Sequence, residues 1–152
     1  MASDVTIEPL RRFLLGLLFL GLGGMTVELL LLGHYESATQ LVPFASIALA
    51  LGCLIWHVVS GSEGSVQALQ VVMTVLVFVG VVGIVLHYRG NMAFQLDIDP
   101  AQSSWSLFSK VVRAKAPPAL APAAMSQLGL LGLAYAWRHP ATRQPGTHSQ
   151  GA

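Results

Sequence analysis

Two histidines and a glutamate combine metal-ligand chemistry with positions near the predicted ends of apolar runs: His34, Glu36 and His87. Imidazole and carboxylate groups bind Zn²⁺, Cu²⁺ and Fe²⁺, and two histidines on facing helices can hold a b-type haem. The chain has no HxxxH, HExxH, CxxC or CxxCH pattern that would fix a ligand geometry. The alternative is that these side chains hydrogen-bond lipid headgroups where the helices leave the bilayer. A metal or haem site is therefore one of two open interpretations.

Glu28 is a carboxylate inside an apolar run. A charge at mid-bilayer costs roughly 2.5–3.5 kcal/mol, less near a helix end, so this group must be protonated, paired or in contact with water. Gly21 and Gly24 share its helix face and allow another backbone to approach. This predicts that Glu28 points into the bundle. It would act as a proton, ion or metal ligand, or as a structural carboxyl bonded to Tyr35, Gln127 or a backbone group.

Long apolar segments must position these side chains. Of the 152 residues, 54% are hydrophobic and 10% are charged, against about 25% charged in a typical soluble domain. About 20 apolar residues cross a hydrocarbon core as a helix. Four segments are predicted to do so: residues 13–32, 41–59, 66–86 and 119–137. The third is rich in β-branched residues, but an open strand would leave backbone groups unpaired in lipid.

The connections determine which side chains share a membrane face. Residues 33–40 and 60–65 are short turns, so the first three helices should be antiparallel neighbours. The end of the first, the start of the second and the end of the third then lie together, which predicts that His34, Glu36 and His87 converge. His57 and His139 fall on the opposite face, where we expect solvated histidines, with pairing between them as the alternative.

A longer connection follows the third span. Asp99 is predicted as an N-cap and Pro100 as the first residue of an amphipathic helix over 100–115. Its apolar side should rest on the membrane surface with Trp105 pointing inward, although packing on another protein remains open. Residues 1–139 would form one membrane domain, and 140–152 a disordered tail.

The predicted fold is therefore all-α: a four-helix transmembrane bundle with a short interfacial helix between the third and fourth spans. Arg11 and Arg12 precede the first span, which favours both termini in the cytoplasm of a bacterial inner membrane. No hydrolase elbow or phosphate-binding loop occurs, which makes an enzyme the less favoured class, and the net charge of +1 implies no nucleic-acid partner.

Three functions stay open. The favoured one is a non-enzymatic scaffold or accessory subunit that contacts the bilayer and packs against a partner membrane protein or another copy of itself. The second is a redox or metal-handling protein that uses His34, Glu36 and His87. The third is a minimal oligomeric transporter with Glu28 as its coupling residue.

Overall fold

The computed structural model describes residues 2–114 and 119–142 of the chain. These residues form five α-helices and one 3₁₀ turn, and no strand occurs among them. The elements are α1 (Ala2–Leu31), α2 (Ala38–Ser60), α3 (Glu63–Ile98), α4 (Ser104–Val112), α5 (Leu120–Ala136) and η1 (Pro140–Thr142). The predicted all-α class is confirmed.

Three helices are long and apolar enough to cross a bilayer: α2, α3, and the Ile7–Leu31 part of α1. The outer faces of these helices expose large apolar side chains, among them Leu20 at 72% and Val59 at 82% exposure. Water would drive such surfaces to aggregate, whereas lipid solvates them. The chain is therefore a small multi-pass membrane protein. The fourth apolar helix, α5, is shorter, with 17 residues.

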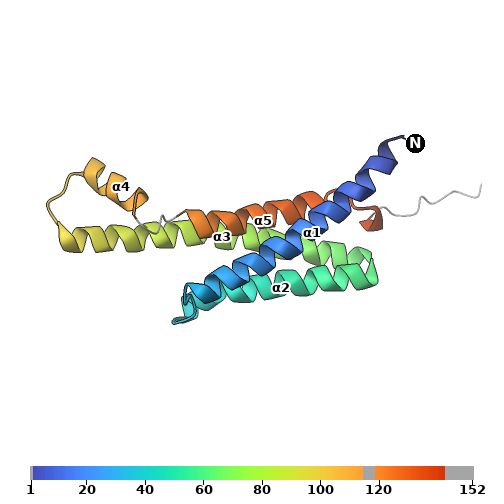
Figure 1. Cartoon of the computed structure of the whole chain (residues 1–152), viewed down its shortest axis with the longest axis horizontal. Helices are drawn as coiled ribbons and strands as arrows, with labels where there is room; N and C mark the ends of the chain where they lie inside the picture. The colour runs from blue at the N-terminus through green and yellow to red at the C-terminus, as the bar shows by residue number, and fades with distance from the viewer. Residues whose placement is uncertain (1, 115–118, 143–152) are drawn as a thin grey trace, which may run out of the picture.

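Four helices pack side by side as a bundle (Figure 1). Helix α1 packs against α2 and α5, and α3 packs against the same two helices. The start of α1 and the end of α5 lie at the same end of the bundle, while α3 runs past the other end and carries α4 (Figure 1). One end of the bundle is therefore flanked by the extension of α3 and by α4, and the other by the start of α1 and the end of α5.

Local sequence explains the tight turns between the first three helices. Gly33 follows α1 and Gly61 follows α2, and both have a positive φ that other residues rarely adopt. Ser37 and Gln40 form a capping box at the start of α2. The side chain of Ser62 accepts a hydrogen bond from the backbone at the start of α3. The connections, residues 32–37 and 61–62, are shorter than the predicted turns at 33–40 and 60–65.

Glycines let α3 and α5 approach closely. A Cβ added at Gly129 would lie 2.7 Å from the carbonyl oxygen of Met73, so no larger residue fits without a shift. Ser126 of α5 donates a hydrogen bond to the carbonyl of Val77 across the same contact, at 3.0 Å. Close backbone packing of this kind is the usual source of helix association in lipid.

The region after residue 86 differs from the prediction. Helix α3 continues for twelve more residues to Ile98, and Asp99 caps its C-terminus rather than starting the next helix. Helix α4 starts at Ser104 with Ser103 as N-cap, so the predicted helix over 100–115 is too long. The apolar composition of a segment indicates how far it extends through lipid, but it does not determine where the helix ends. A helix continues until a residue stops it, and the first strong stop signal after residue 86 is Pro100.

Helix α4 folds back along the far part of α3 (Figure 1). Val111 is fully buried, while Trp105 is 76% exposed and its ring stacks on Phe108. Helix α4 therefore uses part of its apolar side to contact α3. Whether Trp105 meets the membrane surface stays a prediction. Of the predicted disordered tail, residues 140–142 form η1, and 143–152 lie outside the described residues.

Candidate functional site

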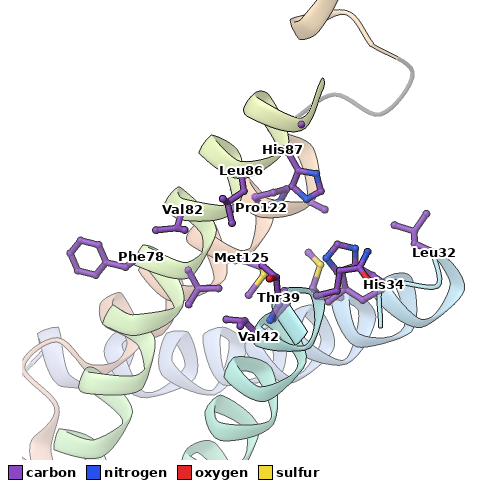
Figure 2. A pocket seen from close by; sticks show the side chains of 18 of the residues that line it. Leu32, His34, Thr39, Val42, Phe78, Val82, Leu86, His87, Pro122 and Met125 are labelled. Carbon is purple, nitrogen blue, oxygen red and sulfur yellow. The ribbon is translucent and has the colours of Figure 1, made fainter. Parts of the chain in front are cut away.

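A cavity of about 640 Å³ opens at the end of the bundle where α1 turns into α2. All four bundle helices contribute to its wall, mostly with aliphatic side chains. Its polar lining residues lie toward the α1–α2 turn and the far half of α3: His34, Thr39, Gln40, His87 and Asn91. Figure 2 shows His34 and His87 near one end of the cavity and Phe78 at the other. The cavity thus has an apolar body and a polar rim.

His34 and His87 come together as the sequence predicts. Their ring centroids lie 5.9 Å apart with an angle of 27° between the ring planes. His34 is held by the left-handed turn at Gly33, and His87 by the continuation of α3 beyond the predicted span. Among the described residues, neither imidazole has a hydrogen-bond partner. Both rings therefore have free donors and acceptors at the rim.

Glu36 does not complete a ligand set with these histidines. Within residues 2–114 and 119–142, no group of three or more His, Cys, Asp or Glu side chains could hold a metal ion. The backbone N–H of Glu36 instead donates to the side chain of Gln40 in the capping region of α2. The structure brings together the imidazole pair without a third ligand.

The imidazole of His34 is biased toward its neutral form. Partial burial lowers the pKa of His34 below its usual value of 6.5, and the nearby charge of protonated His87 lowers it further. When one of two adjacent imidazoles is protonated, protonating the other costs additional free energy because the two positive charges repel. Near neutral pH, His34 therefore offers one N–H donor and one nitrogen acceptor.

A second polar cluster closes the opposite end of the bundle. His57 of α2 is 5% exposed and lies between Ser65 of α3 and Tyr135 of α5. Its Nδ1 is 2.9 Å from the Ser65 hydroxyl, and its Nε2 is 3.0 Å from the Tyr135 hydroxyl. One buried side chain thus joins three helices.

The hydrogen bonds around Ser65 determine the tautomer of His57. The Ser65 hydroxyl donates its hydrogen to the carbonyl of Ser62 at 2.6 Å. It must therefore accept from His57 Nδ1–H, which leaves Nε2 as an acceptor for the Tyr135 hydroxyl. Every polar atom of the His57 ring is satisfied. Ser65 is fully buried, so this Ser–His contact is a structural network rather than a nucleophile and base facing a substrate.

Arg11 binds the end of α5 beside this network. Its guanidinium donates to the carbonyls of Tyr135, Trp137 and Arg138 at 2.6, 2.9 and 3.1 Å. The last carbonyls of a helix lack intrahelical partners and carry partial negative charge, so a cation there is favourable. Arg11 thereby ties the start of α1 to the end of α5.

The expectation of two solvated histidines is wrong for His57, and the pairing alternative holds. The His57 and His139 rings meet edge to face with centroids 4.8 Å apart. Burial lowers the pKa of His139, and the charges of His57 and Arg11 lower it further, against a smaller raising effect of Glu8. The sequence placed these histidines on one face, but nothing in it indicated that Tyr135 would turn toward His57.

Glu28 lies on the outside of α1, next to a smaller hollow of about 420 Å³. Gly21, Gly24 and Gln127 also line this hollow, so the predicted neighbourhood of Glu28 is present. Among the described residues, however, its carboxylate makes no hydrogen bond or ion pair. The side chain of Glu28 is exposed and borders the hollow between α1 and α5, so it lies outside the buried core rather than pointing into it.

The two ends of the bundle thus have different chemistry. One is closed by a satisfied polar network, and the other holds a largely apolar cavity with unpaired imidazoles at its rim. Such a cavity can hold a molecule that is itself mostly apolar. No family model matches the chain, and no curated protein or solved structure matches it either.

Proposed function

We propose that the protein is a four-span, non-enzymatic membrane component that binds one lipid-like molecule in the cavity of its bundle. The observation that carries this proposal is the cavity itself: about 640 Å³, lined by aliphatic side chains of all four bundle helices and polar at one end. Binding sites for small molecules have volumes of roughly 300–1,000 Å³ and are mostly apolar with a few polar groups. A cavity within a bilayer is reached most easily by molecules dissolved in that bilayer.

Two observations support α5 as the fourth span. Its 17 residues cover about 26 Å, close to the hydrocarbon thickness of roughly 30 Å. Arg11 binds the carbonyls at the end of α5, so the start of α1 and the end of α5 lie at one end of the bundle, as an even number of crossings requires. The arginines before the first span favour the cytoplasmic side of a bacterial inner membrane for that end.

Cysteine accessibility tests this topology. In a Cys53→Ser background, single cysteines would replace Glu36 and Asp97 at one end and Glu63 and Ala141 at the other. An impermeant maleimide added to spheroplasts should label the first pair only, because the second pair would face the cytoplasm. Labelling at position 141 together with positions 36 and 97 would mean that α5 does not cross, and would rule out four spans.

A pair of valines on α3 tests ligand binding. Val82 lines the cavity and is 54% exposed, whereas Val81 is 48% exposed and does not line it. We expect Val82→Trp to fill the cavity and remove the bound molecule, while Val81→Trp retains it. Protein purified in detergent would be extracted with solvent, and the amount of each lipid per mole of protein measured by mass spectrometry. Equal retention by both variants would refute the proposed function.

Metal or haem binding is the second candidate, favoured by the contact between His34 and His87. Two imidazoles supply two of the ligands that a metal centre needs, and Glu36 would have to move to supply a third. Absorption spectra and elemental analysis of the purified protein test this. A Soret band, or one metal per chain that is lost in His87→Ala, would support this candidate.

A further inference from the structure

The charge of the cavity wall indicates what kind of headgroup the cavity accepts. Apart from the two histidines, no side chain with an ionisable group lines it among the described residues. Phosphate groups in proteins are bound mainly by Arg, Lys and helix N-termini. The wall therefore offers a phospholipid headgroup no cationic side chain such as Arg or Lys, and only the first turns of α2 and α5 border it.

The rim instead offers hydrogen bonds. The His34 and His87 rings have no partner among the described residues, and both line the cavity. Since partial burial and the proximity of His87 favour neutral His34, the His34 ring presents an N–H donor and a lone-pair acceptor without a positive charge of its own. An oxygen that is uncharged, such as a carbonyl or hydroxyl, is the complement of such a rim.

The rest of the wall is suited to an apolar tail. Leu29 of α1, Phe78 and Leu86 of α3 and Met125 of α5 line the cavity below the rim. Pro122 of α5 lies against Gly80 and Gly83 of α3, so the two helices approach closely there. Phe78 is 64% exposed on the side away from the histidines (Figure 2), so a tail can leave the cavity toward lipid at that end.

We infer that the occupant is an amphiphile with an uncharged, oxygen-bearing head, which hydrogen-bonds His34 and His87 while its apolar tail lies along α3 and α5. This inference rests on the proposed function and specifies its ligand class. A quinone or quinol ring and the glycerol end of a diacylglycerol share this chemistry. An anionic or zwitterionic phospholipid does not, because its phosphate would enter a wall without a cationic partner.

Matched probes test the head. Protein in detergent micelles would be titrated with dioleoylglycerol, decylubiquinone, and dioleoylphosphatidylglycerol as the anionic counterpart of the first. Native mass spectrometry would report the bound fraction of each. We expect the first, the second or both to bind at least tenfold more tightly than the phosphatidylglycerol. Which of the two neutral probes binds more tightly identifies the source of the head.

Substitutions at the rim test the two histidines. We expect His34→Leu and His87→Leu each to weaken binding of the neutral probe about 3- to 10-fold, the range for one lost hydrogen bond. His34→Gln and His87→Gln should retain most of the affinity, because an amide keeps a donor and an acceptor. Tyr35→Leu is the matched control, since Tyr35 is exposed beside His34 and does not line the cavity. Thermal unfolding of each variant would separate lost binding from lost folding.

The outcomes separate the two proposals. If Val82→Trp binds every probe as well as Val81→Trp, the cavity is not the binding site and both proposals fail. If Val82→Trp alone loses binding, yet the phosphatidylglycerol binds as tightly as the neutral probes, only the inference about the head fails. The same holds if the leucine variants at His34 and His87 bind the neutral probe like the wild-type protein.

Discussion

Individual side chains at the closed end of the bundle are coupled by buried hydrogen bonds. His57 has both ring nitrogens satisfied, by Ser65 and Tyr135, and it contacts His139 on its edge. A buried acceptor that loses its partner costs more free energy than an average hydrogen bond contributes. The energetic weight of this network is therefore best measured by removing one donor at a time.

Tyr135→Phe removes the hydroxyl that donates to His57 Nε2 and keeps the ring. We expect the free energy of unfolding to fall by about 1–3 kcal/mol, because the buried nitrogen is left without a donor. Tyr35→Phe removes a hydroxyl that is exposed and should change stability by less than about 0.5 kcal/mol. Unfolding in detergent, followed by circular dichroism, compares the two. Equal effects would mean that the His57–Tyr135 bond adds nothing.

Two adjacent arginines provide a second comparison. Arg11 binds three carbonyls at the end of α5, whereas the partner of Arg12 among the described residues is exposed Glu8 at 3.2 Å, one turn away. We expect Arg11→Ala to lower the free energy of unfolding by about 1–2 kcal/mol, since its guanidinium is only partly buried, and Arg12→Ala by about 0.5 kcal/mol or less. Unfolding in detergent, followed by circular dichroism, measures the stability of both variants. A larger loss for Arg12→Ala would contradict the role given to Arg11.

The two histidine pairs differ in how well the sequence predicts them. The contact of His34 with His87 follows from two short turns and the direction of three helices, which apolar runs and turn residues reveal. The burial of His57 depends on Tyr135, 78 residues further along, and on the rotation of α5 about its own axis. Helix rotation is set by the packing of both helices, so a single sequence carries no direct signal for it.

Among the elements, α3 has the most extensive packing, since its contacts with α2 and α5 exceed those of α1 and it also contacts α4 and η1. Its contact with α5 depends on glycines that leave no room for a side chain. In α2, by contrast, Gly52 has no atom within 4 Å of an added Cβ. Comparing substitutions at Gly129 and Gly52 therefore distinguishes the packing role of a glycine from the effect of its low helix propensity.

Gly129→Ala should lower the free energy of unfolding by about 1–3 kcal/mol, because the methyl group would press on the backbone of Met73. Gly52→Ala should leave stability unchanged or raise it by up to about 1 kcal/mol, since alanine is the better helix former. Thermal unfolding midpoints of the two variants give the comparison. If Gly129→Ala were as stable as Gly52→Ala, α3 and α5 would not be closely packed at this point.

The positions of the helices can be predicted from the sequence where apolar runs mark a membrane span, but less well in the polar region after residue 86. The apolar runs at 41–59 and 66–86 lie within observed helices, and the run at 13–32 exceeds α1 by one residue. The extension of α3 to Ile98 was missed, because residues after 86 are polar but still favourable for a helix. The sequence predicts Asp99 at the start of the next helix because Asp followed by Pro is a common start signal. The Asp99–Pro100 pair is equally suited to end a helix, and only the path of the backbone shows that it ends α3 rather than starting α4.

At the scale of the whole molecule, both ends of the bundle contain a histidine outside the spans whose pKa is lowered. His34 faces His87, while His139 faces His57, Arg11 and Glu8. The folded state therefore binds fewer protons than the unfolded state as the pH falls below 6.5. The stability that these groups contribute is complete above pH 6.5 and is lost as the pH falls through their lowered pKa values.

We expect the thermal unfolding midpoint to be highest at about pH 7.5 and to decrease steadily toward pH 5.5. His34→Gln and His139→Gln together should flatten this decrease, because glutamine does not titrate. Differential scanning fluorimetry in detergent at constant ionic strength measures both profiles. A midpoint that rises on acidification would show that the two histidines gain protons on folding, contrary to their burial.

The length of α3 has a mechanical consequence. Thirty-six residues form a rod of about 54 Å, whereas the hydrocarbon layer is roughly 30 Å thick. The part of the rod beyond the cavity carries α4, which is fastened to it by buried Val111 and by a Lys110–Asp99 contact of 3.8 Å. An unbroken rod moves as a lever, so a small change in the lean of α3 where it borders the cavity becomes a larger sideways displacement of Trp105 and Phe108 at its tip.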